Sequence, residues 1–362
     1  MYGKLFRKIP HSNFSSVWEV HAAHKPNMFL GAFSGGSWRH ESMAKTLEYI
    51  TDESKHSKLQ KQAEENLNNW AQKKIDPPLR VEVSYKDWGV ATLEATKTFG
   101  TSYSVLNMAN SLFPGGAALE GGSAQEENMW HRSSCARSLL DRTVYLNKES
   151  NLFEYRDSAR ALLEAASKMT EDELHSLSEI RGESITEAYK VLFCPEPRVC
   201  FRGAEVLVAP DIDDTGTRNQ LIADSMMSYP ILPNADIYPF YELRSAAPEL
   251  SSKPNTWNDQ DLLKLYETDL RQRIGAQLDT LILAGKRHVI LGAWGCGAFK
   301  NDPERIAKIY HEEIEKRANY FQHILFPIIQ TDYNSDNFGI FNKYLNGLKL
   351  ANTDSVEPNF KY

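Results

Sequence analysis

The chain of 362 residues carries a formal net charge of −7, and 41% of its residues are hydrophobic. This length allows a sizeable core, in one large domain or in two or three smaller ones. The negative charge argues against a broad basic surface for nucleic acid. The four cysteines form no CxxC pair and no zinc-ligand pattern with histidine, so we interpret them as reduced thiols. No signal peptide or membrane span is indicated. We therefore expect a monomer without a nucleic-acid or membrane partner, cytoplasmic in the producing cell or, if exported by another route, in a host cell.

The first part of the chain is predicted to be mainly helical. Apolar residues recur at helical spacing within 58–74, and a Pro-Pro pair shortly afterwards ends the helix. Alternating apolar residues then predict a strand over 79–85, and a second strand is expected over 103–108. Residues 147–195 are interpreted as a helical insertion, because Thr170 with Glu173 and Ser184 with Glu187 have capping-box spacing.

The later part of the chain alternates between strand and helix patterns. Strands are expected over 204–210, 288–294 and 323–330, the last with a proline that indicates a bulge or a sheet edge. A helix is expected over about 262–274, and Asn301–Pro303 is a helix-start signal. Strands alternating with helices predict an α/β fold with a mostly parallel sheet covered on both faces, in which ligands bind beyond the carboxyl ends of the strands. The regions we expect are a helical extension (1–78), a core with the insertion (79–345) and a tail (346–362).

A glycine-rich run directly follows the second predicted strand. Small residues over 115–122 allow backbone N–H groups to approach a ligand, and they lead to Gln125, Glu126 and Glu127. The same pattern is also typical of a surface loop before a helix whose first turn is acidic. A second run, "LGAWGCGAFKNDP" (291–303), lies between a strand and a helix start, where loop and helix amides could face an anion together. Alone, this run could also be a tight turn.

An acidic cluster follows the strand expected over 204–210. Its members, Asp211, Asp213 and Asp214, are also ordinary turn formers. If the cluster borders the site, it could accept a cationic group by charge-assisted hydrogen bonds.

These motifs together carry a resemblance to a known family. "VLNMANSLFPGGAALEGGSAQEENMWHRSS" (105–134) resembles the signature of the bacterial-type poly(ADP-ribose) glycohydrolases, a branch of the macrodomain superfamily, in which a GGG loop leads through a short spacer to QEE. The run from 291 is similar to the family's second glycine loop, and weaker blocks extend the resemblance from about Arg39 to Tyr344. The resemblance implies a three-layer α/β/α macrodomain-like fold. Two departures are Ala117, which stands where the family has a third glycine, and the longer insertion.

The resemblance also implies an activity, the hydrolysis of an ADP-ribosyl group at the anomeric carbon of its distal ribose. Glu127 matches the family's general acid, which then acts as the base, and Glu126 would hold ribose hydroxyls. Burial and the charge of Glu126 would raise the pKa of Glu127. The diphosphate itself stabilises the transition state, so no metal or other cofactor is implied. The residues implied to contact ADP-ribose are Asp87 (at the adenine), Asn107 (at the distal ribose), Gly115, Gly116, Ala117, Gln125, Gly292, Gly295, Cys296, Gly297, Ala298 and Phe299.

Several functions remain compatible with the sequence. The substrate could be poly(ADP-ribose) or a mono-ADP-ribosylated protein, including an arginine-linked one cleaved by a bacterial effector. A non-catalytic reader could bind ADP-ribose through the same loops, since a fold does not determine its function. The intact glutamate pair argues against the reader, because a pure binder needs no acid.

Overall fold

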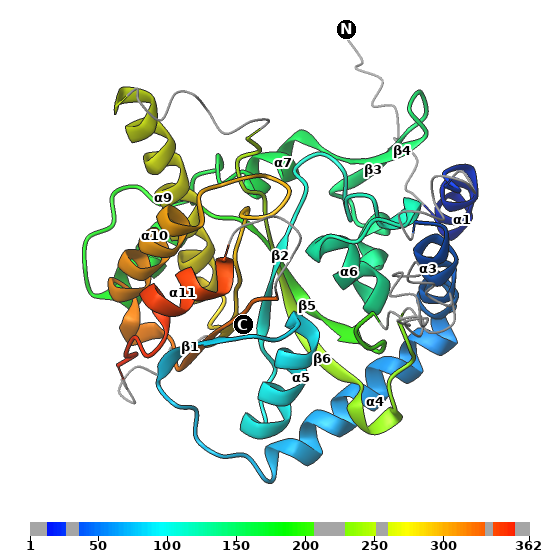
Figure 1. Ribbon diagram of the computed structural model, residues 1–362, viewed down its shortest axis with the longest axis horizontal. Coiled ribbons are helices and arrows are strands. Elements are labelled where there is room, and N and C mark those ends of the chain that lie inside the picture. Colours follow the sequence, from blue (N-terminus) through cyan, green and yellow to red (C-terminus); the bar gives the residue numbers. More distant parts are fainter. Residues whose placement is uncertain (1–12, 27–35, 206–228, 251–259, 330–335, 352–362) are drawn as a thin grey trace, which may run out of the picture.

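The computed structural model describes residues 13–26, 36–205, 229–250, 260–329 and 336–351. Its centre is a six-stranded sheet in the order β1-β8-β7-β2-β6-β5 (Figure 1). The neighbouring strands are parallel from β1 to β6, and β5 pairs antiparallel with β6 at one edge. The mostly parallel sheet predicted from the sequence is confirmed. In sheet order the strands are β1 (Arg80–Ser84), β8 (His323–Pro327), β7 (His288–Ile290), β2 (Ser104–Met108), β6 (Tyr238–Ser245) and β5 (Leu192–Cys200).

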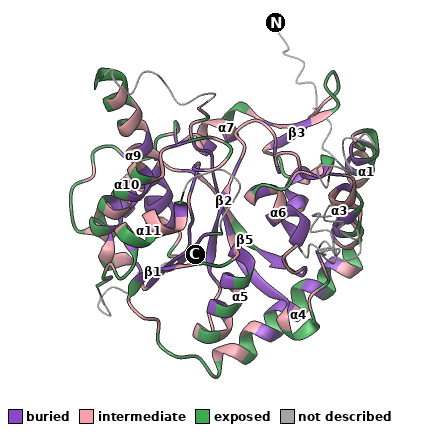
Figure 2. Ribbon diagram, in the orientation of Figure 1, coloured by how far each residue is buried: buried purple, intermediate pink, exposed green. Residues whose placement is uncertain are grey.

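Two hydrophobic cores cover the two faces of the sheet. Successive residues of β2 point to opposite faces, so Val105 packs in one core and Leu106 in the other. The central strands are therefore almost wholly buried (Figure 2). One core includes residues of α3 (Gly36–Thr51), α4 (Glu53–Ala71), α5 (Trp88–Phe99) and α6 (Gln125–Arg132). The other includes α9 (Gln260–Leu283), α10 (Pro303–Glu315) and α11 (Asn337–Leu345).

The N-terminal segment is helical, as expected. It comprises α1 (Phe14–Ala23), α3 and α4, and the side chains of Asn13 and Asp52 cap α1 and α4 by accepting backbone N–H groups of the first turn. Leu59 and Ala63 of α4 are buried, which is the apolar stripe that the sequence predicts. Within the described ranges, no helix is long and apolar enough to cross a bilayer.

The prediction of a helical insertion over 147–195 is only partly right. The hairpin of β3 (Val144–Asn147) and β4 (Leu152–Tyr155) precedes two helices, α7 (Asp157–Leu163) and α8 (Glu171–Arg181). Thr170 and Glu173 do form a capping box, but Ser184 and Glu187 begin no helix. From Leu192 the chain becomes β5, because backbone pairing with β6 outweighs the local pattern. The register of β5 shifts between Cys194 and Arg198, where Pro195 and Pro197 cannot donate a hydrogen bond.

The remaining strand predictions need smaller corrections. β7 ends at Ile290 rather than near 294, because the backbone turns at Gly292, whose carbonyl accepts the N–H of Trp294. β8 lies inside the sheet, not at its edge, and Pro327 is its last residue. β6 is a central strand that the pattern did not reveal. The helix expected over about 262–274 is α9, and Asp302 caps α10 with proline in the first turn, as predicted. Most of the strand expected over 204–210 lies outside the described residues.

Candidate active site

The two adjacent glutamates lie in the first turn of α6, which begins beside the end of β2. Gln125, the first residue of α6, fixes this junction: its Oε1 accepts the N–H of Met108 at 2.9 Å, and its Nε2 donates to the carbonyl of Leu106 at 2.9 Å. Both polar ends of the side chain are thus occupied by strand backbone. Gln125 therefore positions α6 against β2, and its contact with a ligand stays a prediction.

Glu126 is 3% exposed, and the preceding loop surrounds its carboxylate with donors. Its Oε2 accepts the N–H of Asn110 at 2.7 Å, and its Oε1 accepts that of Gly115 at 3.1 Å. The Nδ2 of Asn107 lies 3.5 Å from the same Oε1. Both oxygens of Glu126 are therefore acceptors of protein N–H groups, an arrangement that suits the ionised form.

Glu127 has a different environment. Its Oε1 accepts the N–H of Ala117 at 3.0 Å, whereas its Oε2 is buried and has no hydrogen-bond partner among the described residues. A proton on Oε2 would disturb no existing hydrogen bond, but a proton on either oxygen of Glu126 would face an N–H donor. The geometry therefore favours Glu127 Oε2 as the position of a proton held by the pair.

The pKa values of both glutamates are shifted upwards. Burial, and after it the charge of Glu127, raises the pKa of Glu126 well above its ordinary value. Burial likewise raises the pKa of Glu127, while the hydrogen bond from Ala117 lowers it in part. The raised pKa expected for Glu127 is present with burial as its main cause, but the charge that adds to it is that of Glu120 and not that of Glu126. Because the donors around Glu126 hold its oxygens, we assign the shared proton to Glu127.

The first glycine loop binds these carboxylates rather than an external anion. The N–H groups of Gly115 and Ala117 donate to Glu126 and Glu127, and that of Gly116 donates to the carbonyl of Phe113 at 3.0 Å. In this arrangement the three amides already have acceptors within the protein, and their contact with a diphosphate stays a prediction. The reason is proximity, since the nearest anions are those that α6 presents to the same loop.

The glycines of this loop are required by close contacts. Gly115 and Gly116 have φ of +82° and +55°, and a side chain on Gly115 would collide with the indole of Trp130. A Cβ on Gly116 would lie 2.3 Å from Glu127 Oε1. Ala117 has φ of −95°, which any residue adopts, and its methyl group lies on the side of Gly122. The departure at Ala117 therefore introduces no backbone strain.

The second glycine loop lies beside the first, at the carboxyl ends of β7 and β2. These strands are neighbours in the sheet, and the methyl group of Met108 packs against Gly292, where a Cβ would be 2.5 Å away. The carbonyl of Ser245 joins the two loops, since it accepts the N–H of Ala109 at 3.1 Å and the indole N–H of Trp294 at 3.0 Å. Both loops therefore lie at the same edge of the sheet, at the carboxyl ends of neighbouring strands.

Backbone donors in the second loop are free. In the part of the chain that the structure describes, the N–H groups of Gly295, Gly297, Ala298 and Phe299 have no acceptor. Asn301 holds the loop by donating from Nδ2 to the carbonyls of Pro248 and Gly295, at 2.8 and 3.0 Å. Consecutive free amides in a loop, here those of residues 297–299, form an anion-binding nest.

Cys296 does not contribute its side chain to this nest. It is 4% exposed and its thiol points to the carbonyl of Trp294, while its own N–H donates to Ala293. Cys296 therefore has contacts inside the loop, and its contact with a ligand stays a prediction. The side chain of Phe299 is half-buried and packs against the neighbouring core.

Asp87 and Asn107, which were expected to contact ADP-ribose, are both engaged within the protein. Asp87 caps α5 and accepts from the buried guanidinium of Arg132 at 2.7 Å, all through Oδ1. Asp87 therefore serves as a helix cap and in an ion pair, and its contact with the adenine stays a prediction. Asn107 is fully buried and donates from Nδ2 to Glu242 at 2.8 Å, while its Oδ1 has no partner among the described residues.

The aspartates at 211, 213 and 214 lie outside the described residues, so their position relative to the site stays a prediction.

The sequence analysis did not identify Glu242 and Arg244. The run "YPFYELRS" places these two charges in an otherwise apolar stretch, which is a usable signal of a buried ion pair.

Part of the chain matches a known protein family, and the chain is similar to several solved structures. Residues 37–173 match the family model of the microbial-type PARG catalytic domain, where PARG is poly(ADP-ribose) glycohydrolase. The resemblance is confirmed over this segment, which contains β2, α6 and both glutamates. Solved structures similar to the chain include the glycohydrolase of Deinococcus radiodurans in complex with ADP-ribose (20% identity, 78% of this chain and 91% of that chain, TM-score 0.44). The glycohydrolase of Thermomonospora curvata bound to the inhibitor ADP-HPD is also similar (20% identity, 84% and 98%, TM-score 0.47). No curated protein sequence matches the chain.

Proposed function

We propose that this chain, in which residues 37–173 carry the microbial-type PARG catalytic pattern, is an ADP-ribosyl glycohydrolase. It would bind ADP-ribose at the carboxyl ends of β2 and β7 and hydrolyse the glycosidic bond at the distal ribose of a poly- or mono-ADP-ribosylated protein. The observation that carries the proposal is the asymmetry of the glutamate pair. One carboxylate is held by N–H donors on both oxygens, and the other has a buried oxygen with no partner in the described chain.

The proposed reaction uses Glu127 twice. In the first step Glu127 Oε2–H gives its proton to the departing oxygen or nitrogen, the bond from that atom to the anomeric carbon breaks, and positive charge develops on the ribose. In the second step the Glu127 carboxylate takes a proton from water as the water oxygen bonds to the anomeric carbon. The products are free ADP-ribose and the released acceptor group, and Glu127 is protonated again. Glu126, ionised beside it, would hold a ribose hydroxyl.

The second glycine loop would bind the diphosphate of the substrate. The free amides of Gly295, Gly297, Ala298 and Phe299 would hold the diphosphate, whose negative charge stabilises the developing cation. No amide of Gly115–Ala117 takes part in this step, because the glutamates and Phe113 occupy them. We therefore assign diphosphate binding to the second loop alone.

Matched isosteric variants test the roles of the two glutamates. In Glu127→Gln the new NH₂ group can take the position of Oε2, so the bond from Ala117 survives and the fold stays intact. In Glu126→Gln one of the N–H groups of Asn110 and Gly115 must face another N–H, at a cost of about 1–3 kcal/mol in stability. We expect Glu127→Gln to lose turnover while it keeps its free energy of unfolding and its ADP-ribose affinity, and Glu126→Gln to lose stability as well.

The assay measures free ADP-ribose released from polymer, arginine-linked and serine-linked substrates by wild type and by Glu127→Gln. Unchanged hydrolysis by Glu127→Gln on the substrate that wild type cleaves would falsify the role of Glu127. Calorimetric binding of ADP-ribose with no release from any substrate would favour a reader instead. Release from polymer alone would exclude the arginine-linked substrate that the aspartate cluster suggested.

The pH profile gives an independent check. Glu127 must be protonated to act as the acid, so kcat/KM should fall as pH rises through its raised pKa. The alkaline limb of the profile should therefore lie above the ordinary glutamate pKa of about 4.3. A limb at or below that value would contradict the assignment.

A further inference from the structure

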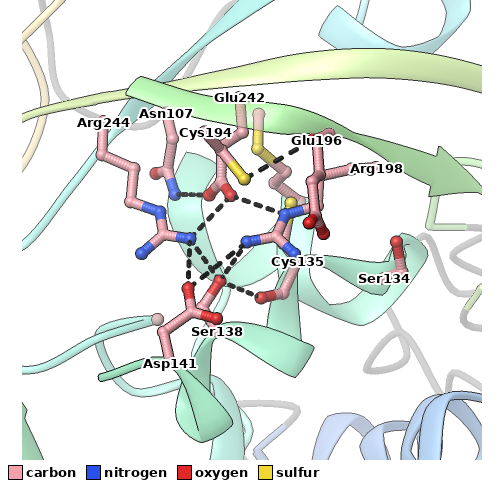
Figure 3. A network of polar contacts seen from close by, with 12 residues as sticks. Asn107, Ser134, Cys135, Ser138, Asp141, Cys194, Glu196, Arg198, Glu242 and Arg244 are labelled. Carbon is pink, nitrogen blue, oxygen red and sulfur yellow. Dashed lines mark hydrogen bonds and ion pairs between the residues drawn. The ribbon is translucent and has the colours of Figure 1, made fainter. Parts of the chain in front are cut away.

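A buried ion cluster lies beneath the glutamate pair, on the same face of the sheet. Glu242 and Arg244 of β6 and Arg198 of β5 form it (Figure 3). Glu242 is fully buried, and its Oε2 accepts from Arg244 Nη2 at 2.9 Å and from Arg198 Nε at 3.2 Å. Its other oxygen, Oε1, accepts from Asn107 Nδ2 at 2.8 Å. The cluster therefore uses one carboxylate oxygen for the two arginines and the other for the asparagine beside the active site.

Glu242 is charged, because its two arginine partners hold it in the ionised form. Burial alone would raise its pKa, but Arg244 and Arg198 lower it to about 2. A carboxylate in this state can only accept hydrogen bonds. The two arginines also donate to Ser138 Oγ, and Asp141 lies 3.7 Å from Arg198 and 3.9 Å from Arg244, which balances the remaining positive charge.

This charge state determines the orientation of the Asn107 amide. The two ends of an asparagine amide have almost the same shape, so only the hydrogen-bond partners decide which end faces which group. An acceptor-only Glu242 excludes Oδ1 and requires Nδ2 on its side. The second hydrogen of Nδ2 then points towards Glu126 Oε1, 3.5 Å away. Oδ1 faces away from Glu242 and is left as a buried acceptor with no partner in the described chain.

We propose that Glu242 is a positioning residue that holds Asn107 Oδ1 as the acceptor for a hydroxyl group of the distal ribose. This inference rests on the proposed function. It adds the residue contacts that would let the site distinguish a ribose with a free hydroxyl group from one without it. Asn107 makes the contact, and Glu242, held by Arg198 and Arg244, decides that the contact is made by an acceptor. A buried acceptor without a donor is unfavourable, so the hydroxyl completes the hydrogen bonding of the site.

The variant Glu242→Gln should reverse the orientation of the Asn107 amide. The two guanidinium groups can only donate, so they select the amide oxygen of the new glutamine at the position of Oε2. Its NH₂ group then replaces Oε1 and faces Asn107, which must turn its own Oδ1 towards it. The atom presented to the ribose changes from an acceptor to a donor. We expect ADP-ribose affinity to fall about tenfold or more, as for a mismatched buried hydrogen bond.

The decisive experiment is a double-mutant cycle measured by calorimetric binding of ADP-ribose. In the background of Asn107→Ala, Glu242→Gln should cause no further loss of affinity, whereas independent structural effects would add. The matched control is Glu313→Gln in α10, where a 4% exposed carboxylate also accepts from two arginines, Arg317 and Arg271. This control should lose stability but bind ADP-ribose like wild type. Additive losses, or an equal loss of affinity in the control, would overturn the proposal.

A second measurement needs only the wild type, in case Glu242→Gln does not fold. ADP-ribose analogues that each lack one hydroxyl of the distal ribose are compared with ADP-ribose itself. We expect one of them to bind about tenfold more weakly or worse. If every such analogue binds as tightly as ADP-ribose, Asn107 accepts no hydroxyl and the inference is wrong, although the proposed function stands. If the wild type neither binds ADP-ribose nor releases it from any substrate, the proposed function fails and takes this inference with it.

Discussion

Gly116→Ala is a test of how closely the first glycine loop is fitted to the carboxylates of Glu126 and Glu127, which we propose to be catalytic. A Cβ at this position would lie 2.3 Å from Glu127 Oε1 and 3.4 Å from Glu126 Oε2. Ordinary contact begins at 3.4 Å, so the Glu127 carboxyl group must move by about 1 Å. A displacement of that size costs on the order of 100-fold in rate when it affects a catalytic group. The positive φ of 55° adds about 1 kcal/mol of backbone strain for alanine.

The control for this variant is Gly182→Ala. Gly182 ends α8 with φ of +65°, and a Cβ there would meet nothing within 4 Å. Both variants should lower the melting temperature by a similar amount, because both place alanine in the left-handed region. Only Gly116→Ala should lower kcat for the release of ADP-ribose by about 100-fold. The reasoning is refuted if folded Gly116→Ala keeps the kcat of wild type, or if Gly182→Ala loses as much activity.

Three further predictions concern stability and the departure from the family motif. Asp87→Ala should cost about 3–5 kcal/mol in the free energy of unfolding, because it leaves Arg132 buried without its carboxylate. The control is Asp52→Ala, which removes a helix cap of the same kind but no buried ion pair and should cost about 1 kcal/mol. Equal losses of the two variants in denaturant titrations would contradict a stabilising ion pair between Asp87 and Arg132. Ala117→Gly should not raise kcat, since the φ of −95° needs no glycine, and a several-fold gain in the release assay would show that the methyl group obstructs the substrate. The lowered pKa of Glu242 contributes stability that is present above pH 4.5 and is lost as the pH falls towards 2. The difference in unfolding free energy between wild type and Glu242→Gln should therefore shrink by about 3 kcal/mol between pH 4.5 and pH 2. A difference that stays constant over this range would contradict the prediction.

Several local features followed directly from the sequence. The spacing from the glycines to Glu126 and Glu127 was enough to predict a loop that leads into an acidic first turn, because helix starts and glycine loops are specified by neighbouring residues. The caps at Thr170 and Asp302 were likewise predicted from adjacent residues. The parallel sheet followed from the alternation of strands and helices.

The partners of each polar group were decided only by the tertiary structure. Local pattern suggested that the amides of Gly115 and Ala117 were free for a ligand, but the turn of the chain brings two carboxylates from ten or eleven residues farther on into contact with them. Asp87 has the sequence of a simple helix cap, and its ion pair comes from a residue 45 positions away.

The same holds for Asn107, whose orientation depends on a glutamate 135 residues away on a strand that the pattern did not reveal. Sequence by itself predicted the two glycine loops and the acidic first turn of α6, because capping, glycine turns and hydrophobic periodicity act over a few residues. The tertiary structure decided which donors meet which acceptors, and so which carboxylate has N–H partners on both oxygens. That choice depends on burial and on contacts between distant segments, which no local pattern encodes.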